Sequence, residues 1–282
     1  MKYDGRALAL QMYDELKKRV DTLKAHDVTP HLSLLLVGDN PASKAYIAQK
    51  KKWGKYIGAE IQVIHFPEQA TTEELHKTVL QLNTDASVHG IIAQRPLPEH
   101  IDKEFLAAET VPVKDIDGFH PNTTFVIPVA AAVVRILEEI YPQTNNHHGT
   151  FQAWLQTSSI VTIGKGDTAG KPIIDYLRKL GAHPTVLDSH SEDPDASIRS
   201  ADIVISSVGK QRILRKDNIK HGAILIGVGI TKDREEGTVG DYDESEITEI
   251  ASYYTPTPGG VGPVNVAYLL TNLVTAAEQL NP

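Results

Sequence analysis

The sequence contains no cysteine, which excludes disulfide bonds, thiolate zinc sites, iron–sulfur clusters and thiol nucleophiles. It also lacks a run of about 18 apolar residues, so we expect no segment to span a membrane. There is no surplus of basic residues: 28 Lys and Arg stand against 36 Asp and Glu, and the net charge of −8 disfavours a nucleic-acid partner. The first residues, MKYDG, begin no apolar segment of a signal peptide. We therefore expect a soluble cytoplasmic protein.

Short apolar runs alternate with amphipathic segments along the 282 residues, a length that holds one large domain or two ordinary ones. Strands are expected at the apolar runs 32–37, 61–66, 90–93, 159–163, 184–187, 202–208 and 223–228. Helices are expected at 4–26, 41–57, 128–140, 170–180 and 264–280, with one more opening at a capping box formed by Thr71 and Glu74. This alternation predicts an α/β protein with parallel sheets, whose second unit is of Rossmann type.

The polar, turn-rich segment 141–149 is the candidate domain boundary. We expect the last helix to pack back on the first domain, which gives predicted domains of 1–140 plus 260–282 and of 141–259. His147 and His148 lie in the boundary segment. Because no carboxylate stands at ligand spacing from them, we interpret this pair as part of a solvated linker, and we expect no metal site.

A glycine-rich turn follows the strand expected at 159–163. Gly164, Gly166 and Gly170 have the spacing G-x-G-x-x-x-G, one residue longer than the dinucleotide-binding fingerprint. Such glycines let the backbone turn tightly and approach a phosphate at a helix N-terminus. Asp188 ends the next strand, where an acidic side chain can accept hydrogen bonds from ribose hydroxyls. The alternative is a plain strand–helix turn that binds nothing.

Tyr46 and Lys50 are four residues apart and therefore share one face of the helix expected at 41–57. Burial lowers the pKa of a lysine, and a lysine whose pKa lies nearer neutrality can move protons. The alternative is that Lys50 forms a solvated basic face with the two lysines that follow it.

Further segments place polar or flexible residues at a strand end and in loops. Gln94 directly follows the strand expected at 90–93, and open α/β sheets place their sites at the carboxyl ends of strands. Segment 114–121 (KDIDGFHP) combines charges, a glycine and an aromatic residue in one loop. Segment 255–263 (TPTPGGVGP) can press its backbone against a flat ligand. Each of them can equally be a structural turn.

Together, these segments resemble the motifs of the bifunctional methylenetetrahydrofolate dehydrogenase/methenyltetrahydrofolate cyclohydrolase (FolD) family. The family's V-G-x-x-P-A-S-x-x-Y-x-x-x-K is matched by 37–50, its Q-x-P-L-P by 94–98, its K-D-x-D-G-F-H-P by 114–121, its A-D-I-V-x-x-x-V-G-K by 201–210 and its T-P-x-P-G-G-V-G-P by 255–263. The resemblance covers nearly the whole chain. It implies a folate-binding catalytic domain, completed by the C-terminal helix, and a Rossmann-like NAD(P)-binding domain.

The resemblance implies an enzyme that oxidises 5,10-methylenetetrahydrofolate to 5,10-methenyltetrahydrofolate with NAD(P)⁺ and hydrolyses the product to 10-formyltetrahydrofolate. It implies that Lys50 is the proton-transfer group of the hydrolysis, that Tyr46 stacks near the folate and assists, and that Gln94 positions Lys50. Asp117 is then the residue that binds the pterin edge, since a carboxylate accepts hydrogen bonds from its N–H donors. The implied folate-binding residues are Tyr46, Lys50, Gln94, Pro96, Asp117, Gly259, Gly260 and Pro263.

The cofactor site departs from the family pattern. The implied cofactor-binding residues are Gly164, Lys165, Gly166, Asp188, Ser189, Val208, Gly209, Gly229 and Ile230. The family's Gly-Arg-Ser turn is Gly164-Lys165-Gly166 here, and lysine meets a 2′-phosphate only as a point charge. The family's His-Ser pair aligns with 190–191 or with 188–189, and in the second alignment Asp188 disfavours a 2′-phosphate. NADP is the usual cofactor of the family, and NAD remains open as the alternative.

The segment after Pro121 is rewritten relative to the family: 122–128 is short, and Val129-Ala130 stands where the family has Cys-Thr. This departure affects the dehydrogenase half, whereas the folate motifs are intact. The alternative reading is a catalytically reduced paralogue, either a cyclohydrolase only or a non-catalytic binder of folate or nucleotide. The resemblance also implies a homodimer.

Overall fold

The computed structural model describes residues 1–144, 149–233 and 237–282. The chain forms two compact units, one of residues 1–8 and 129–265 and the other of residues 9–128 and 266–282. The domain limits derived from the sequence, 1–140 plus 260–282 and 141–259, stay a prediction. His147 and His148 lie outside the described residues. Within the described ranges, no helix is both long and apolar enough to cross a membrane.

Helices and strands alternate as the sequence predicts, and the expected elements are confirmed to within the few residues by which such boundaries vary. The helices are α1 (Gly5–Lys24), α2 (Pro41–Ile57), α3 (Thr72–Thr84), α4 (Lys103–Glu109), α5 (Pro128–Ile140), η1 (Tyr141–Gln143), α6 (Phe151–Thr157), α7 (Gly170–Lys179), α8 (Pro194–Ser200), α9 (Glu244–Ile247) and α10 (Val261–Leu280). The strands are β1 (His31–Val37), β2 (Glu60–Phe66), β3 (Gly90–Ala93), β4 (Ile160–Ile163), β5 (Thr185–Leu187), β6 (Ile203–Ser206), β7 (Ile224–Gly227), β8 (Ile230–Asp233), β9 (Gly237–Gly240) and β10 (Tyr253–Tyr254).

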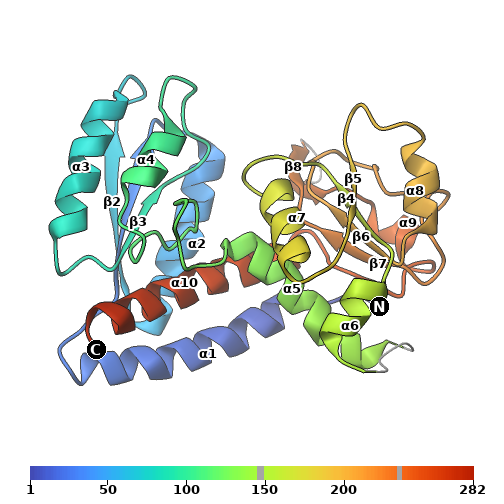
Figure 1. Cartoon of the computed structure of the whole chain (residues 1–282), viewed down its shortest axis with the longest axis horizontal. Coiled ribbons are helices and arrows are strands. Elements are labelled where there is room, and N and C mark those ends of the chain that lie inside the picture. Colours follow the sequence, from blue (N-terminus) through green and yellow to red (C-terminus); the bar gives the residue numbers. More distant parts are fainter. Residues whose placement is uncertain (145–148, 234–236) are drawn as a thin grey trace. The chain divides into compact units, whose positions relative to one another are not determined.

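The unit of residues 9–128 and 266–282 is built on a parallel sheet with the strand order β2-β1-β3. The central strand β1 is apolar on both faces because helices cover both (Figure 1). Leu32, Leu34 and Leu36 pack with apolar residues of α1, α2 and α10, while Leu35 and Val37 pack with those of α3 and α4. The C-terminal helix α10 thus completes the core of this unit, as the sequence predicts.

Capping residues set the ends of the helices that follow the first strands. Asn40 caps α2, where its side chain accepts hydrogen bonds from the N–H groups of Ala42 and Ser43. Gly58 ends α2 with a φ of 86°, a left-handed conformation that favours glycine. The predicted capping box of α3 is present, with Thr71 and Glu74 bonded reciprocally.

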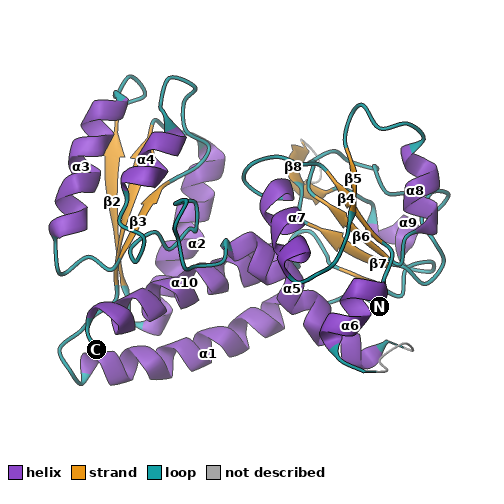
Figure 2. Cartoon of the chain, in the orientation of Figure 1, coloured by secondary structure: helices purple, strands orange, loops and turns teal. Residues whose placement is uncertain are grey.

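The unit of residues 1–8 and 129–265 contains a parallel sheet with the strand order β10-β7-β6-β4-β5 (Figure 2). From β4 the chain proceeds to β5 on one side and then to β6 on the other, so the strand order reverses beside β4. In open α/β sheets, ligands bind at the carboxyl ends of strands next to such a reversal. The Rossmann-type arrangement predicted for this part of the chain is confirmed.

Several short elements carried no recognised sequence pattern: α4, α6, α8, α9, the β8–β9 hairpin and β10. Each is too short to show a helical or strand period. One expectation is wrong in detail, because α10 begins at Val261, within the segment 255–263 that was expected to be loop. Pro263 lies in the first turn of α10, where the N–H that proline lacks has no intrahelical acceptor.

Candidate functional site

Lys50 lies on the buried face of α2 and is only 7% exposed. Its Nζ donates a hydrogen bond to Oε1 of Gln94 over 2.9 Å. Burial lowers the pKa of Lys50, and the negative charge of Asp117 opposes this shift. The predicted solvated basic face is therefore wrong for Lys50, although Lys51 and Lys52 are exposed.

Gln94 stands directly after β3 and is also 7% exposed. Its Nε2 donates to the carbonyl oxygen of Arg95 over 2.7 Å, and its backbone N–H donates to Leu35 over 2.9 Å. Because Nε2 is engaged as a donor, Oε1 must face Lys50. A neutral amide oxygen accepts a hydrogen bond from a lysine in either protonation state, so Gln94 holds Nζ without favouring the charged form as a carboxylate does.

Tyr46 lies one turn before Lys50 on α2 and is half-buried. Burial raises the pKa of the Tyr46 phenol, so this group stays protonated at neutral pH. Asp117 is half-buried and lies close enough to Lys50 for its charge to raise the pKa of the amine. The structure therefore brings together Lys50, Gln94 and Asp117, which are far apart in the sequence.

The loop that carries Asp117 is held by buried polar side chains. Nζ of Lys114 donates to the carbonyl oxygens of Leu82, Asn83 and Asp85 at 2.9, 3.0 and 2.7 Å. These contacts fasten the loop to the C-terminal end of α3, where a cation is favoured.

Two more side chains hold the same loop. Asp115 is buried, which raises the pKa of its carboxyl group, and its Oδ2 accepts a hydrogen bond of 2.7 Å from the N–H of His120. Asn272 of α10 donates to the carbonyl oxygens of Ile116 and Val126. Asp117 is therefore presented from a rigid loop.

Sequence reasoning missed Ser43 and Arg95 as members of this region. Ser43 is 1% exposed on the buried face of α2, and its Oγ has no hydrogen-bond partner among the described residues. The guanidinium of Arg95 lies 3.7 Å from the centroid of the Phe119 ring, within the range of a cation–π interaction. Both residues stand inside the quoted motifs. Arg95 directly follows Gln94, and Ser43 lies seven positions before Lys50 on the same buried face of α2, which is the signal that could have identified them.

The three glycines of the turn after β4 differ in how much space a side chain would have at each of them. Gly164 has a φ of 92°, and a Cβ there would come within 2.8 Å of Val208. A Cβ on Gly170 would lie 2.3 Å from the carbonyl oxygen of Gly164, so α7 can approach β4 only without a side chain. A Cβ on Gly166 would meet nothing within 4 Å. Gly166 therefore borders open space, whereas Gly164 and Gly170 are closely packed.

The turns after β6 and β7 meet at the same end of the sheet. A Cβ on Gly209 would lie 2.7 Å from the carbonyl oxygen of Ile230, and one on Gly229 would lie 2.3 Å from the nitrogen of Gly209. Val208 and Ile230 are exposed apolar side chains beside these glycines. Five predicted cofactor-binding residues therefore converge here: Gly164, Val208, Gly209, Gly229 and Ile230.

Asp241 holds these turns, and the sequence analysis missed it. Its side chain is fully buried, with Oδ2 accepting hydrogen bonds from Oγ of Ser206 at 2.7 Å and from the N–H of Val208 at 3.3 Å. Its Oδ1 accepts a hydrogen bond of 2.8 Å from the N–H of Lys210. No local pattern revealed this residue, because its partners lie more than 30 positions earlier in the chain.

Lys165 and Asp188 form an ion pair, with Nζ 2.7 Å from Oδ2. The lysine comes from the turn after β4 and the aspartate directly follows β5, so the pair lies at the carboxyl ends of neighbouring strands. Ser189 is exposed beside it. The hydrogen bond from Lys165 is the main reason why the pKa of Asp188 falls to about 2.

Gly259, Gly260 and Pro263 belong to the unit of residues 1–8 and 129–265, whereas Lys50, Gln94, Pro96 and Asp117 belong to the other unit. Gly260 approaches the first turn of α1 so closely that a Cβ on Gly5 would lie 2.0 Å from its carbonyl oxygen. A side chain on Gly260 itself would collide with Thr255. The loop therefore depends on its glycines for close packing.

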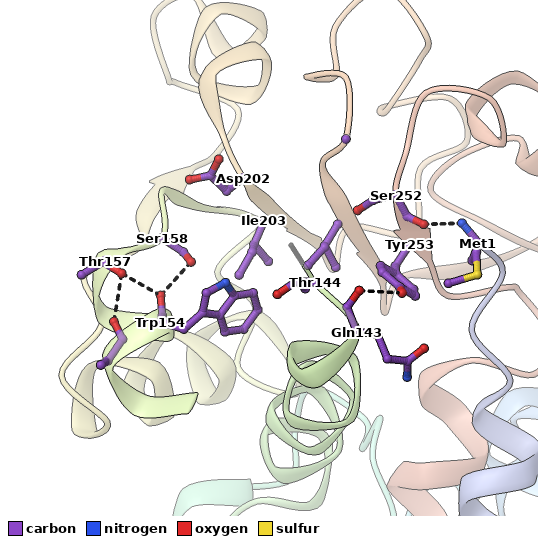
Figure 3. A pocket seen from close by; sticks show the side chains of 13 residues that line it. Met1, Gln143, Thr144, Trp154, Thr157, Ser158, Asp202, Ile203, Ser252 and Tyr253 are labelled. Atoms are coloured by element: carbon purple, nitrogen blue, oxygen red, sulfur yellow. Dashed lines mark hydrogen bonds between the residues drawn. The ribbon is translucent and has the colours of Figure 1, made fainter. Parts of the chain in front are cut away.

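A cavity of about 730 Å³ lies elsewhere, at the amino ends of β6, β7 and β10 (Figure 3). Trp154 and Tyr253 line it, and none of the predicted site residues does. Its polar groups bond within the protein: the Tyr253 hydroxyl donates to Gln143, and Ser158 donates to Trp154. Since parallel sheets bind ligands at the opposite end, this cavity is not the dinucleotide site. Across residues 1–144, 149–233 and 237–282, no group of three or more His, Cys, Asp or Glu could hold a metal ion.

The fold and these two groups of residues define a class: an α/β enzyme with a dinucleotide-binding domain and a second domain that carries a buried lysine. Comparison of the sequence with known families identifies it further. Residues 3–117 match the catalytic domain of tetrahydrofolate dehydrogenase/cyclohydrolase, and residues 147–281 match the NAD(P)-binding domain of the same enzymes. The chain belongs to the tetrahydrofolate dehydrogenase/cyclohydrolase family, as the sequence motifs predict.

Individual relatives agree with this assignment. The bifunctional protein FolD of Nautilia profundicola is 36% identical over 284 residues, covering 98% of this chain and 96% of the relative. The crystal structure of the bifunctional FolD enzyme of Campylobacter jejuni is similar with a TM-score of 0.89, 35% identity and 98% coverage of both chains. The Trypanosoma brucei enzyme, solved with NADP and an inhibitor, has a TM-score of 0.89 at 31% identity, covering 99% of this chain and 97% of that one.

Proposed function

We propose that this chain oxidises 5,10-methylenetetrahydrofolate to 5,10-methenyltetrahydrofolate with NAD(P)⁺ and hydrolyses the product to 10-formyltetrahydrofolate. The observation that carries the proposal is the buried Lys50 amine, held by a neutral amide in the catalytic domain of this family. Burial lowers the pKa of this amine, which favours the proton transfer that the hydrolysis requires.

The hydrolysis takes both protons from a water molecule, gives one proton to N5 and releases the other. The water oxygen bonds to the methenyl carbon and loses its first proton. The remaining hydroxyl proton leaves as the bond from that carbon to N5 breaks, N5 gains a proton and the carbon becomes the formyl group. We assign these proton transfers to Nζ of Lys50, which passes the surplus proton to solvent. The methenyl group is an amidinium cation, so it favours a neutral amine over an ammonium beside it. Burial of Lys50 acts in the same direction by lowering the pKa of the amine.

We assign the binding of the substrate to residues around Lys50. The Asp117 carboxylate accepts hydrogen bonds from the amino and N–H donors of the pterin, and Lys114, Asp115 and Asn272 hold its loop in place. The protonated phenol of Tyr46 offers a flat apolar face for stacking. Pro96, Gly259, Gly260 and Pro263 complete the proposed folate-binding set.

The oxidation needs alignment more than acid–base chemistry. When bound, the nicotinamide accepts the hydride that leaves the methylene carbon of the substrate. The residues proposed to hold the dinucleotide are Gly164, Lys165, Gly166, Asp188, Ser189, Val208, Gly209, Gly229 and Ile230. Support comes from the open space in front of Gly166, the N-terminus of α7 and the exposed apolar side chains of Val208 and Ile230.

A spectrophotometric assay tests both activities in one sample. Absorbance of the methenyl product is followed during its formation with each cofactor and then during its decay after the cofactor is removed. Formation and decay that depend on the protein support the proposal, whereas binding of folate without either reaction contradicts it. If no methenyl product forms, methenyltetrahydrofolate is added directly, and its protein-dependent decay then identifies a cyclohydrolase alone.

Three finer points are also proposals: a homodimer, a cytoplasmic location and a functional division at 1–140 plus 260–282 and 141–259. Light scattering after size exclusion tests the first, because a dimer has twice the chain mass of 30.9 kDa. Family membership supports all three.

A further inference from the structure

The ion pair between Lys165 and Asp188 stands where a Rossmann-type sheet meets the adenosine ribose. In the order β10-β7-β6-β4-β5, the glycine turn follows β4, and Asp188 follows β5, the next strand along the chain. An acidic side chain at the end of that second strand accepts hydrogen bonds from the ribose hydroxyls in NAD-binding domains. The topology therefore places the Asp188 carboxylate at the group that distinguishes the two nicotinamide cofactors.

Local hydrogen bonds hold the Asp188 carboxylate in this position. Its Oδ1 accepts from the N–H of His190 at 2.9 Å and from Oγ of Ser191 at 3.4 Å. The backbone N–H of Asp188 donates to Oγ of Ser191 over 2.9 Å. The carboxylate is thus part of a turn that holds it at the end of β5.

Lys165 does not supply the surplus positive charge that a 2′-phosphate requires. Its Nζ is 2.7 Å from Oδ2 of Asp188, so the pair has no net charge. Glu192 and Asp193 follow in the same loop, both exposed. Asp195 is also near in sequence, but its charge is balanced by Arg215 at 2.9 Å. The Lys165–Asp188 pair therefore offers a doubly charged phosphate no surplus positive charge.

We propose that Asp188 makes this chain selective for NAD⁺ over NADP⁺: its carboxylate accepts a hydrogen bond from the ribose 2′-hydroxyl and, by pairing with Lys165, takes up the positive charge that a 2′-phosphate requires. This inference rests on the proposed dehydrogenase function. It resolves the cofactor choice that the sequence leaves open. It also assigns the Lys165 ammonium to the aspartate and not to a 2′-phosphate.

Binding of each cofactor, measured by isothermal titration calorimetry, tests the inference without requiring turnover. We expect the wild-type protein to bind NAD⁺ at least about tenfold more tightly than NADP⁺, because Asp188 takes up the positive charge that the phosphate requires. Asp188→Asn keeps the shape and the turn but removes the charge, so we expect the preference to fall by about tenfold or more, mainly through tighter NADP⁺ binding. Lys165→Met leaves the carboxylate unneutralised and widens the preference for NAD⁺.

Asp175→Asn is the matched control, since it removes an exposed carboxylate that pairs with Lys171 on α7. We expect it to leave the ratio of the two affinities unchanged. Cyclohydrolase activity, which uses no dinucleotide, reports whether each variant is folded, and Asp188→Ser replaces Asp188→Asn if that variant is not.

The possible results separate the two proposals. A wild-type protein that prefers NADP⁺, with the preference lost in Lys165→Met, shows that the lysine holds the phosphate and overturns the inference while leaving the dehydrogenase function intact. An Asp188→Asn variant with an unchanged ratio overturns it as well. Binding of neither cofactor, with cyclohydrolase activity retained, overturns the dehydrogenase function and the inference with it.

Discussion

The unit of residues 9–128 and 266–282 contains two buried lysines, Lys50 and Lys114, whose surroundings differ. Lys50 is 7% exposed and donates one hydrogen bond, to a side-chain amide. Lys114 is 4% exposed and donates three, to the carbonyl oxygens of Leu82, Asn83 and Asp85. An ammonium has three N–H groups, so all three of Lys114 have acceptors, whereas one hydrogen bond to a protein acceptor is found for Lys50 among the described residues. Burial alone therefore does not distinguish the two lysines. The number of hydrogen-bond acceptors around each amine does.

The electrostatic surroundings sharpen this difference. Burial lowers the pKa of both amines. Lys114 lies at the C-terminal end of α3, where the carbonyl groups favour a cation. The hydrogen-bond partner of Lys50 is neutral, and the charge of Asp117 offsets the effect of burial only in part. We therefore assign the proposed proton transfer to Lys50 and the holding of the loop to Lys114.

The largest expected effect comes from Lys50→Met. Removal of the amine takes away the proton-transfer group, so we expect cyclohydrolase activity to fall by about 10²- to 10⁴-fold. The buried methylene chain is largely retained, so the protein stays folded. Decay of methenyltetrahydrofolate in a stopped assay measures the loss.

Lys51→Met is the control for this substitution, because Lys51 is exposed on the same helix. It should keep the wild-type rate. Full hydrolysis by Lys50→Met would remove Lys50 from the mechanism.

The second largest expected effect is a loss of stability on substitution of Lys114, the other buried lysine. Lys114→Met leaves three carbonyl groups without their donor, and we expect the free energy of unfolding to fall by about 2 to 3 kcal/mol. Denaturation in urea, followed by circular dichroism, measures this change. Lys51→Met again serves as the control, with an unchanged midpoint. A Lys114→Met variant as stable as the wild type would show that the three hydrogen bonds contribute nothing.

Gln94→Glu converts the neutral partner of Lys50 into a charged one. A carboxylate beside the amine favours the ammonium and raises the pKa of Lys50. Because the neutral amine is the proposed base, the rising limb of the cyclohydrolase pH profile should move to higher pH, and the rate at neutral pH should fall by about tenfold. Activity measured across a pH series checks the direction. A shift to lower pH would contradict the proposed role of the neutral amine.

The smallest expected effect comes from Asp241→Asn, which changes a buried carboxyl group in the unit of residues 1–8 and 129–265. The Asp241 carboxyl group accepts hydrogen bonds from Ser206, Val208 and Lys210, much as the Lys114 amine donates to three carbonyl groups. An amide turns one acceptor into a donor that faces other donors, so the turns that carry Val208 and Gly209 loosen. We expect the KM for the nicotinamide cofactor to rise by about three- to tenfold. The cyclohydrolase rate should not change, and a parallel loss of both activities would indicate general unfolding instead.

Much of the architecture could be predicted because local patterns specify it. The continuous apolar run of β1, the capping box at Thr71 and the glycine spacing after β4 each have a physical cause within a few residues of the chain. Short elements such as α4 and the β8–β9 hairpin escaped prediction, since fewer than two helical turns or a few strand residues show no period. The start of α10 was placed too late, because a proline was taken to end the loop when it lies in the first helical turn.

The site was predictable only in part for a related reason. Tyr46 and Lys50 share a helix face by spacing alone, but Gln94 lies 44 positions away from Lys50 and Asp241 lies 35 positions from Ser206. Contacts at such separations depend on how strands and helices pack. Buried supporting residues, among them Lys114 and Asn272, look like ordinary surface residues until their burial is known.

The sequence by itself determined the family, the α/β class and the absence of any chemistry that needs a thiol, because motifs and composition are local properties of the chain. Only the tertiary structure decided which lysine is buried with a single neutral partner and that Lys165 is already paired with Asp188. The physical reason is that burial and charge pairing depend on distances in space. Lys50 and Lys165 are chemically identical in the sequence, and only folding gives one a neutral amide and the other a carboxylate as its partner.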